Sequence, residues 1–459
     1  MGPQFWRTRP RPGPRCRDLV FIQNRGEAVE DEQNGRAESD RTEPAARGGM
    51  ASAKPFLRPT PRIRAGPRRR MKPLVTSAGR QMKHHLLLSL SVLAATGGQV
   101  LAQEKDIQPE TLAVEARISE GNHIYLMDMG ISGSSSVFVL NADDLSLEGN
   151  IGAGTFSQML MSGDGKSIYT GSVYMKRYTR GPIEAVIEEY DPQTLNLRRE
   201  FTVSDKMAQT LSQKGALNLS ADGKYMLVQN ATPATSINVV DLAAGKDLVE
   251  VPTPGCWTAY PSTEGLAFTT ICGDGSLVKY TIGADGTVSE PAKSDKIFDA
   301  DTAPIFGVAL RIDGKLVYIS FDGKLLEVDD SGDKPVLGRT IAFAKDGWAP
   351  SGYTLMAYHA ASKTLFVMMH SNAGDGTHKN PAEEIWAINM TSGEVVGRSA
   401  AHGETNIAVS TGEVPQLIGV DHLGGLHRYD VTLGDTVSLT ESAAKEGAAF
   451  FPTMIATDY

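Results

Sequence analysis

Seven β-rich units follow one another along this 459-residue chain, and this repetition constrains the fold more than any other feature. The mean spacing of about 49 residues is typical of four-stranded propeller blades. Several units contain an Asp-Gly turn, as in SGDGK or RIDGK, before a β-branched and aromatic run such as LVYISF. Asp-Gly provides the positive φ that a tight hairpin requires. Helical periodicity is nearly absent, so we predict an all-β, seven-bladed β-propeller. The strand-like runs begin near Asn122, Lys166, Lys224, Gly265, Lys315, Lys363 and Pro415.

The first hundred residues differ in composition from the rest of the chain. Residues 1–81 contain 18 basic and 8 acidic residues and 10 prolines, which predicts a disordered Arg/Pro-rich segment. Residues 82–102, MKHHLLLSLSVLAATGGQVLA, have the pattern of a secretory signal peptide, with an apolar run too short to anchor the chain in a bilayer. A signal acts at the N-terminus, so residues 1–81 are interpreted as a mis-annotated start; the alternative is a genuine disordered tail. We expect residues 103–459 to form the exported propeller, without a membrane span.

The predicted exported part is strongly acidic and contains two cysteines. Removing residues 1–102 leaves 26 basic and 46 acidic residues, a balance that disfavours nucleic acid as a partner because phosphates would be repelled. Cys256 and Cys272 stand sixteen positions apart in an exported β-rich chain, which favours a disulfide between them. We expect this bridge to link adjacent blades. The alternative is two separately buried thiols.

Catalytic motifs are scarce. No nucleophile elbow, Walker loop or dinucleotide fingerprint is present, and the Asp-rich turns lack the full ligand set of a calcium loop. We therefore predict no catalytic and no metal-binding residue, and we expect the histidines to be isolated polar or packed side chains. Their scatter does not exclude a metal site, since a propeller can bring distant residues together. Outside the signal the histidines are His123, His359, His370, His378, His402, His422 and His427.

Longer phrases resemble the heavy chain of the quinoprotein amine dehydrogenases. The resemblance covers nearly all of the exported part, in order, and includes phrases that a generic propeller would not share, such as NATPATS and GTHK. The phrases GCW and ICG are closer to the aromatic (aralkyl) amine dehydrogenases than to methylamine dehydrogenase. The matching segments are Val173–Leu195, Val228–Leu242, Gly255–Pro261, Thr270–Leu277, Gly347–Ser362 and Gly376–Met390.

The resemblance implies a periplasmic heterotetramer of two heavy and two light subunits that oxidises primary amines to aldehyde and ammonia. Its cofactor, tryptophan tryptophylquinone, belongs to the light subunit, so this chain would supply no catalytic residue and bind no cofactor. Electrons would pass to a blue copper protein such as azurin or amicyanin. Trp257, beside Cys256, is expected to pack on the disulfide.

One departure from the family concerns the substrate entrance. In the family, an aromatic side chain from a loop of the first blade narrows this entrance. The corresponding stretch here, Met127–Leu140, is shorter and has no aromatic residue before Phe138, which places Gly130 or Ile131 at the entrance. Two alternatives remain: an exported propeller scaffold without a redox role, and a lactonase-like propeller hydrolase with a carboxylate-bound metal.

Overall fold

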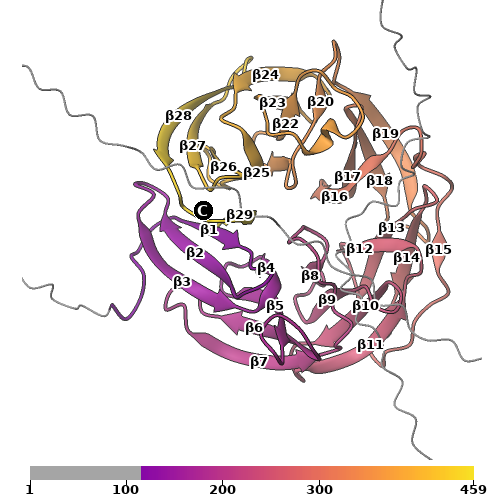
Figure 1. Ribbon diagram of the computed structural model, residues 1–459. Helices are drawn as coiled ribbons and strands as arrows, with labels where there is room; N and C mark the ends of the chain where they lie inside the picture. The colour runs from indigo at the N-terminus through magenta and orange to yellow at the C-terminus, as the bar shows by residue number, and fades with distance from the viewer. Residues whose placement is uncertain (1–114) are drawn as a thin grey trace, which may run out of the picture. The chain divides into compact units, whose positions relative to one another are not determined.

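The computed structural model describes residues 115–459, which form seven antiparallel sheets arranged as the blades of a β-propeller (Figure 1). The predicted fold class is therefore confirmed. The predictions for residues 1–81 and 82–102 lie outside the described residues. Within residues 115–459 the only helical element is the short 3₁₀ turn η1 (Thr377–Lys379), and no helix there is long and apolar enough to cross a membrane.

The first four blades are numbered in chain order, each given from its innermost strand outward. Blade 1 contains β29 (Pro452–Thr457), β1 (His123–Asp128), β2 (Ser135–Asn141) and β3 (Leu147–Ala153). Blade 2 contains β4 (Thr155–Met161), β5 (Ile168–Met175), β6 (Ile183–Tyr190) and β7 (Leu197–Val203). Blade 3 contains β8 (Leu217–Leu219), β9 (Tyr225–Asn230), β10 (Ser236–Asp241) and β11 (Lys246–Pro252). Blade 4 contains β12 (Cys256–Pro261), β13 (Ala267–Cys272), β14 (Leu277–Thr281) and β15 (Ala292–Lys293).

The other three blades complete the ring. Blade 5 contains β16 (Ile305–Ile312), β17 (Lys315–Ser320), β18 (Lys324–Asp329) and β19 (Val336–Ala342). Blade 6 has an interrupted inner strand and contains β20 (Ala349–Pro350), β21 (Met356–His359), β22 (Thr364–His370), β23 (Glu384–Asn389) and β24 (Val395–Ala400). Blade 7 contains β25 (Glu404–Val409), β26 (Gln416–Asp421), β27 (Leu426–Thr432) and β28 (Ser438–Lys445).

The ring closes in blade 1, where the last strand of the chain pairs with the first. β29 runs antiparallel to β1, with Ile124 opposite Thr457 and Met127 opposite Met454. Backbone hydrogen bonds therefore join the two ends of the described chain, so the inner edge of β1 is paired.

Asp-Gly turns join strands within the blades, as predicted. β16 and β17 are connected by Asp313 and Gly314 alone, with φ values of 46° and 81°. Positive φ at both positions is the requirement of a two-residue type I′ hairpin. In the SGDGK turn, Asp164 Oδ1 accepts hydrogen bonds from Ser162 Oγ and the Lys166 amide at 2.7 and 3.1 Å. Its carboxylate thus helps to fix the turn.

The predicted unit starts are displaced by one strand from the true blade boundaries. Each falls within two residues of the second strand of a blade: β1, β5, β9, β13, β17, β22 or β26. Each second strand is a continuous run of at least six residues. Among the innermost strands, β8 and β20 have only three and two residues, and register shifts interrupt the pairing of β4, β12, β16 and β25. The strand signal therefore begins one strand late in every unit.

This displacement explains why the disulfide was predicted to link adjacent blades. Cys256 and Cys272 are bonded, as predicted, but they lie directly opposite each other on β12 and β13, with their Cα atoms 3.9 Å apart. The bridge is therefore inside blade 4, and the prediction that it links adjacent blades is wrong. Counting β12 with the preceding unit had placed the two cysteines in different blades.

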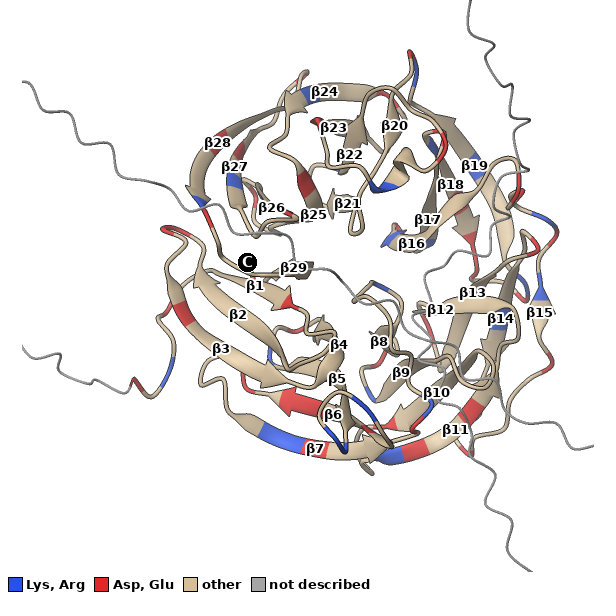
Figure 2. Ribbon diagram, in the orientation of Figure 1, with Lys and Arg blue, Asp and Glu red and all other residues tan. Residues whose placement is uncertain are grey.

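Apolar side chains fill the spaces between blades, and the largest apolar cluster joins blades 5, 6 and 7. It includes Phe366, Trp386 and Leu417, which are at most 1% exposed. Asp and Glu lie mainly on outer strands and connections around the ring, interspersed with Lys and Arg (Figure 2).

The strand directions place two sets of connections at one end of the disc. Neighbouring strands are antiparallel, so the connection between the second and third strands of a blade lies at the same end as the connection to the next blade. We call this end the crossover face. It carries the β1–β2, β5–β6 and β26–β27 connections and also the links β24–β25 and β28–β29.

Candidate functional site

The loop that contains Gly130 and Ile131 connects β1 to β2 on the crossover face, and hydrogen bonds hold it against β4. Thr155 Oγ1 donates to the carbonyl oxygens of Gly130 and Ile131 at 2.8 and 3.0 Å. The Gly130 amide donates to Ser135 Oγ at 3.0 Å. The Ile131 side chain is 39% exposed. The loop backbone is thus fixed by blade 2, while the side chain of Ile131 remains accessible.

Two aromatic residues near this loop were missed at the sequence level. The Phe156 amide donates to Gly130 O at 2.9 Å, and Phe156 is buried with a left-handed φ of 53°. Such a φ is uncommon for a bulky residue and requires support from neighbouring structure. Tyr178, in the β5–β6 connection, is 70% exposed, and its Oη would lie 3.1 Å from a Cβ built on Gly133. These two aromatic side chains therefore belong to blade 2 and lie outside Met127–Leu140 in the sequence.

Exposed apolar side chains continue across the crossover face over three consecutive blades. Ile131 belongs to blade 1, Tyr178 to blade 2, Leu423 to the β26–β27 connection of blade 7, and Phe450 to the link from blade 7 to blade 1. Leu423 is 71% exposed and Phe450 is 91% exposed. We call these four residues the apolar row. Large exposed apolar side chains that gather on one face are typical of a protein-binding surface.

A groove of about 410 Å³ lies on blade 2 and has an acidic lining. Glu184 and Glu200 contribute carboxylates to it, and Tyr174 contributes its ring. Burial, together with a hydrogen bond to Glu188 and the charge of that carboxylate, raises the pKa of Tyr174 well above its usual range. The phenol therefore stays protonated as a donor to Glu188. The remaining lining residues are Val186, Phe201 and Thr202.

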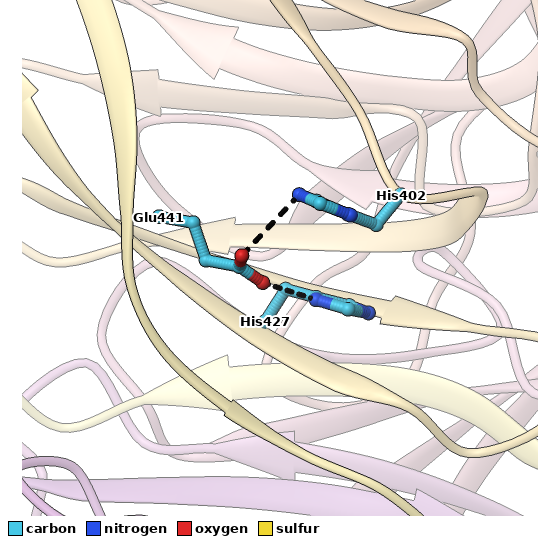
Figure 3. Close-up of side chains that lie close together, drawn as sticks. All are labelled: His402, His427 and Glu441. Carbon is cyan, nitrogen blue, oxygen red and sulfur yellow. Dashed lines mark hydrogen bonds and ion pairs between the residues drawn. The ribbon is translucent and has the colours of Figure 1, made fainter.

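A second cluster of polar side chains lies where blades 6 and 7 meet (Figure 3). His427 projects from β27, Glu441 from β28, and His402 from the β24–β25 link. Glu441 Oε1 lies 2.8 Å from His427 Nδ1, and Glu441 Oε2 lies 3.6 Å from His402 Nε2. The two imidazole rings are stacked, with centroids 4.7 Å apart and planes inclined by 7°. These two histidines are therefore packed against each other and not isolated, and they share one carboxylate.

The local strand structure explains how these side chains meet. A β-bulge on β28 places Glu441 opposite Tyr429 and Ala443 opposite Arg428, which leaves one extra residue between them. Bulges change the direction of side chains in this way. The sequence contains no spacing signal for the cluster, because His402 and Glu441 are far apart in the chain and the bulge is not encoded by a motif.

A buried carboxylate supports the cluster. Glu404, which is fully buried, accepts a hydrogen bond from the His402 amide at 2.7 Å and another from Tyr429 Oη. Burial and the nearby Glu404 carboxylate raise the pKa of Tyr429 above its ordinary value, and the charge of Glu441 adds to this effect. The Tyr429 hydroxyl therefore stays protonated and donates a hydrogen bond to Glu404. The carboxylates of Glu404 and Glu441 both lie close to the paired histidines.

The described tryptophans pack in the protein interior or against it. Trp386 is 1% exposed, and its Nε1 donates to Glu384 Oε2 at 2.7 Å. Trp348 lies 5.7 Å from Trp386 between ring centroids, and Arg398 stacks over both rings. Trp257 is buried and follows the disulfide-bonded Cys256 in the chain, and its packing on the disulfide stays a prediction. These environments do not fit a redox quinone made from two linked tryptophans, which needs two indole rings in bonding contact and open to substrate.

Comparison with known proteins gives a consistent family assignment. A family model described as methylamine dehydrogenase heavy chain matches residues 120–450. The methylamine dehydrogenase heavy chain of Methylophilus methylotrophus is 25% identical over 395 residues, which cover 83% of this chain and 96% of the relative. That of Methylorubrum extorquens is 27% identical over 314 residues, which cover 66% of this chain and 76% of the relative.

Among solved structures, a Bacteroides fragilis protein assigned as a 6-phosphogluconolactonase superimposes with a TM-score of 0.52 and 13% identity. This match covers 76% of this chain and 100% of the other, and at such low identity it shows a common fold only. The family match extends over nearly the whole described propeller and includes both the β1–β2 loop and the paired histidines. This chain belongs to the methylamine dehydrogenase heavy chain family.

Proposed function

We propose that this chain is the heavy subunit of a periplasmic amine dehydrogenase that oxidises primary amines to aldehyde and ammonia. The observation that carries the proposal is the family match over residues 120–450. In this proposal a separate light subunit supplies the tryptophan tryptophylquinone, and a blue copper protein such as azurin or amicyanin accepts the electrons. The heavy chain contributes a rigid disc, a docking face and part of the substrate entrance, and the complex contains two heavy and two light subunits.

The apolar row supports a location for the light subunit on the crossover face. Ile131, Tyr178, Leu423 and Phe450 expose apolar surface on three consecutive blades, and the entrance loop lies among them. A light subunit docked there would cover this surface and bring its quinone next to Gly130 and Ile131. Burial of apolar area would contribute to the stability of the complex.

The proposal is tested by separating the subunits. The purified heavy chain should show no amine-dependent dye reduction, and activity should appear when it is combined with a matured light subunit. Phe450→Asp on the apolar row should weaken copurification with the light subunit. Val414→Asp provides the matched control, because Val414 is 75% exposed in the β25–β26 connection at the opposite end of the disc. Turnover by the isolated heavy chain would refute the subunit assignment, and equal effects of the two Asp variants would refute the docking face.

The entrance assignment has its own test. Ile131→Phe restores an aromatic side chain on a loop that Thr155 holds in place, so it should narrow the channel without unfolding the disc. We expect the ratio of kcat/KM between a small alkylamine and an arylethylamine to change by an amount equivalent to about 1–3 kcal/mol. Leu423→Phe, on the same face but in blade 7, should leave the ratio unchanged. A constant ratio in Ile131→Phe with normal assembly would show that Ile131 is not at the entrance.

The same experiment addresses the class of amine. The relatives are named methylamine dehydrogenase heavy chains, whereas the phrases GCW and ICG favour aromatic amines. An entrance without an aromatic gate would be wide enough for an arylethylamine, so the unmodified complex is expected to turn over both classes. A lactonase-like hydrolase and a scaffold without redox role remain as alternatives, and both predict no amine-dependent dye reduction with any light subunit.

A further inference from the structure

We propose that His402, His427 and Glu441 form a binding site for a divalent transition-metal ion of the Zn²⁺ class at the contact between blades 6 and 7. Two imidazole nitrogens and a carboxylate oxygen are a donor set that Zn²⁺ prefers in proteins. One such atom from each of the three side chains lies within 4.8 Å of the others (Figure 3). This inference does not depend on a light subunit or on a quinone.

The donor atoms already lie close to the separations found around a bound ion. Zinc binds nitrogen and oxygen ligands at about 2.0–2.2 Å, so the donor atoms around a tetrahedral ion lie roughly 3.3–3.6 Å apart. Glu441 Oε2 and His402 Nε2 already lie 3.6 Å apart, and Glu441 Oε1 and His427 Nδ1 lie 2.8 Å apart. An ion between them would replace the direct contact of His427 with the carboxylate.

The stacking of the two rings must open when the ion binds. The lone pair of an imidazole nitrogen lies in the ring plane, so two parallel rings cannot both direct a lone pair at one ion. The side chain of His427 is 9% exposed and is fixed within blade 7, whereas that of His402 is 44% exposed and comes from a connection. Rotation of the His402 ring is therefore the movement that completes the site.

The surroundings favour a cation. The Glu441 carboxylate faces both rings, and the Glu404 carboxylate is fixed behind the cluster by the His402 amide and Tyr429 Oη. Gly419 provides the space for Glu404, because a Cβ at that position would lie 2.3 Å from Glu404 Cγ. Glu404 therefore fixes the backbone at His402 and adds a second negative charge close to the cluster.

Occupancy would connect two blades. His402 belongs to the link that leaves blade 6, while His427 and Glu441 lie on the third and fourth strands of blade 7. An ion bound by all three would fix this link on blade 7 and stabilise the folded state by an amount that grows with the logarithm of its free concentration above Kd. Three protein ligands leave a fourth position for water or for a group from a partner on the crossover face.

The test is metal binding by the full-length chain. The metal-free chain is titrated with Zn²⁺ by calorimetry and with Co²⁺ by visible absorption, which reports coordination geometry. The variants His402→Ala and Glu441→Gln are compared with His422→Ala, an exposed histidine of blade 7 that is not one of the three ligands. All four proteins retain the other histidines and cysteines, so the comparison isolates this site.

We expect the unmodified chain and His422→Ala each to bind one equivalent of Zn²⁺. In His402→Ala and Glu441→Gln the affinity for this ion should be at least about 100-fold weaker. The visible bands of four-coordinate Co²⁺ should disappear in the same two variants. His402 is partly exposed and Glu441→Gln preserves shape, so the variants should fold, as circular dichroism will verify. Equal stoichiometry and affinity in all four proteins, or absence of the Co²⁺ bands in the unmodified chain, would overturn the proposal.

Discussion

Apolar clusters join the blades on both sides of the ring, but the cluster at blades 1 and 2 is supplemented by a buried, hydrogen-bonded carboxylate of blade 2. Between blades 5, 6 and 7 the interior is a continuous apolar cluster, in which residues such as Phe366 and Trp386 are almost fully buried. A smaller apolar cluster joins blades 1 and 2. There, on the face of blade 2 that turns toward blade 1, the buried Glu188 also accepts hydrogen bonds from Thr170, Ser172 and Tyr174 of the same blade, and we call this the polar side of the ring. Tyr190, two residues further along the same strand, points in the same direction as Glu188. Its Oη donates to Gly152 O of blade 1 at 3.1 Å, so this face of blade 2 is the one next to blade 1.

The difference follows from how each type of contact responds to neighbouring structure. Apolar packing is nondirectional and tolerates small displacements, so it suits the part of the ring that acts as a scaffold. A hydrogen-bonded carboxylate fixes distances and directions, because each donor must reach one oxygen atom. The polar side of the ring lies next to the β1–β2 loop, where our functional proposal requires a defined backbone position.

The largest expected effect is the loss of apolar packing in blade 6. Trp386→Ala removes a ring that is 1% exposed in the largest cluster, which should lower the free energy of unfolding by about 3–5 kcal/mol. Urea denaturation measures this change. Phe450→Ala is the control, because a side chain that is 91% exposed should contribute less than about 0.5 kcal/mol to stability. Similar midpoints for the two variants would contradict an apolar scaffold on this side of the ring.

A smaller effect is expected on the polar side. Glu188→Gln keeps the shape of the side chain but replaces one acceptor oxygen by a donor. Either the buried hydroxyls of Thr170 and Ser172, which share one oxygen, then lose their acceptor, or the partly buried hydroxyl of Tyr174 does. This should cost about 1–3 kcal/mol in unfolding free energy. Glu184→Gln, on the same strand but exposed, should cost less than about 0.5 kcal/mol. If the two substitutions had equal effects, the buried carboxylate would not be what orders this side.

The sequence predicts the repeated architecture well, because each blade repeats local signals. The turn of Asp313 and Gly314 has the residues that its φ values require, and the alternation of strands and turns recurs seven times. The blade boundaries are less predictable. Register shifts interrupt several innermost strands, and the shift between Trp257 and Tyr260 in β12 is an example. The same weakness led to the wrong placement of the disulfide between blades.

The candidate sites depend on contacts between blades that local patterns do not encode. Ile131 is identifiable because its loop can be aligned with a family phrase, but Phe156 comes from the next blade and has no such signal. His402, His427 and Glu441 meet through a link between blades and a bulge on β28. Only the packing of the link against the outer strands of blade 7 brings them together.

The smallest expected effect concerns the ring closure, where a titratable pair joins β1 to the residue after β29. His123 Nδ1 lies 2.9 Å from Asp458 Oδ2, and Tyr125 Oη donates to the same oxygen at 3.1 Å. Burial alone would lower the pKa of His123, but the hydrogen bond and charge of Asp458, together with the charge of Glu148, raise it above its ordinary value of 6.5. A raised folded-state pKa means that protonated His123 stabilises the fold.

This contribution is fully present below pH 6.5 and is lost as the pH rises through the folded-state pKa. Asp458→Asn should therefore reduce the free energy of unfolding more at pH 6 than at pH 8.5, with a difference on the order of 1 kcal/mol. Asp430→Asn is the control, since Asp430 is exposed and hydrogen-bonds to Gln416 and Ser442 rather than to a histidine. The free energy of unfolding of the unmodified chain and of the two variants is measured by urea denaturation at both pH values. If Asp458→Asn lowered the free energy of unfolding by the same amount at both pH values, protonated His123 would not contribute to ring closure. Backbone pairing of β29 with β1 would then close the ring, and Glu188 alone would supply the stabilising carboxylate on the polar side.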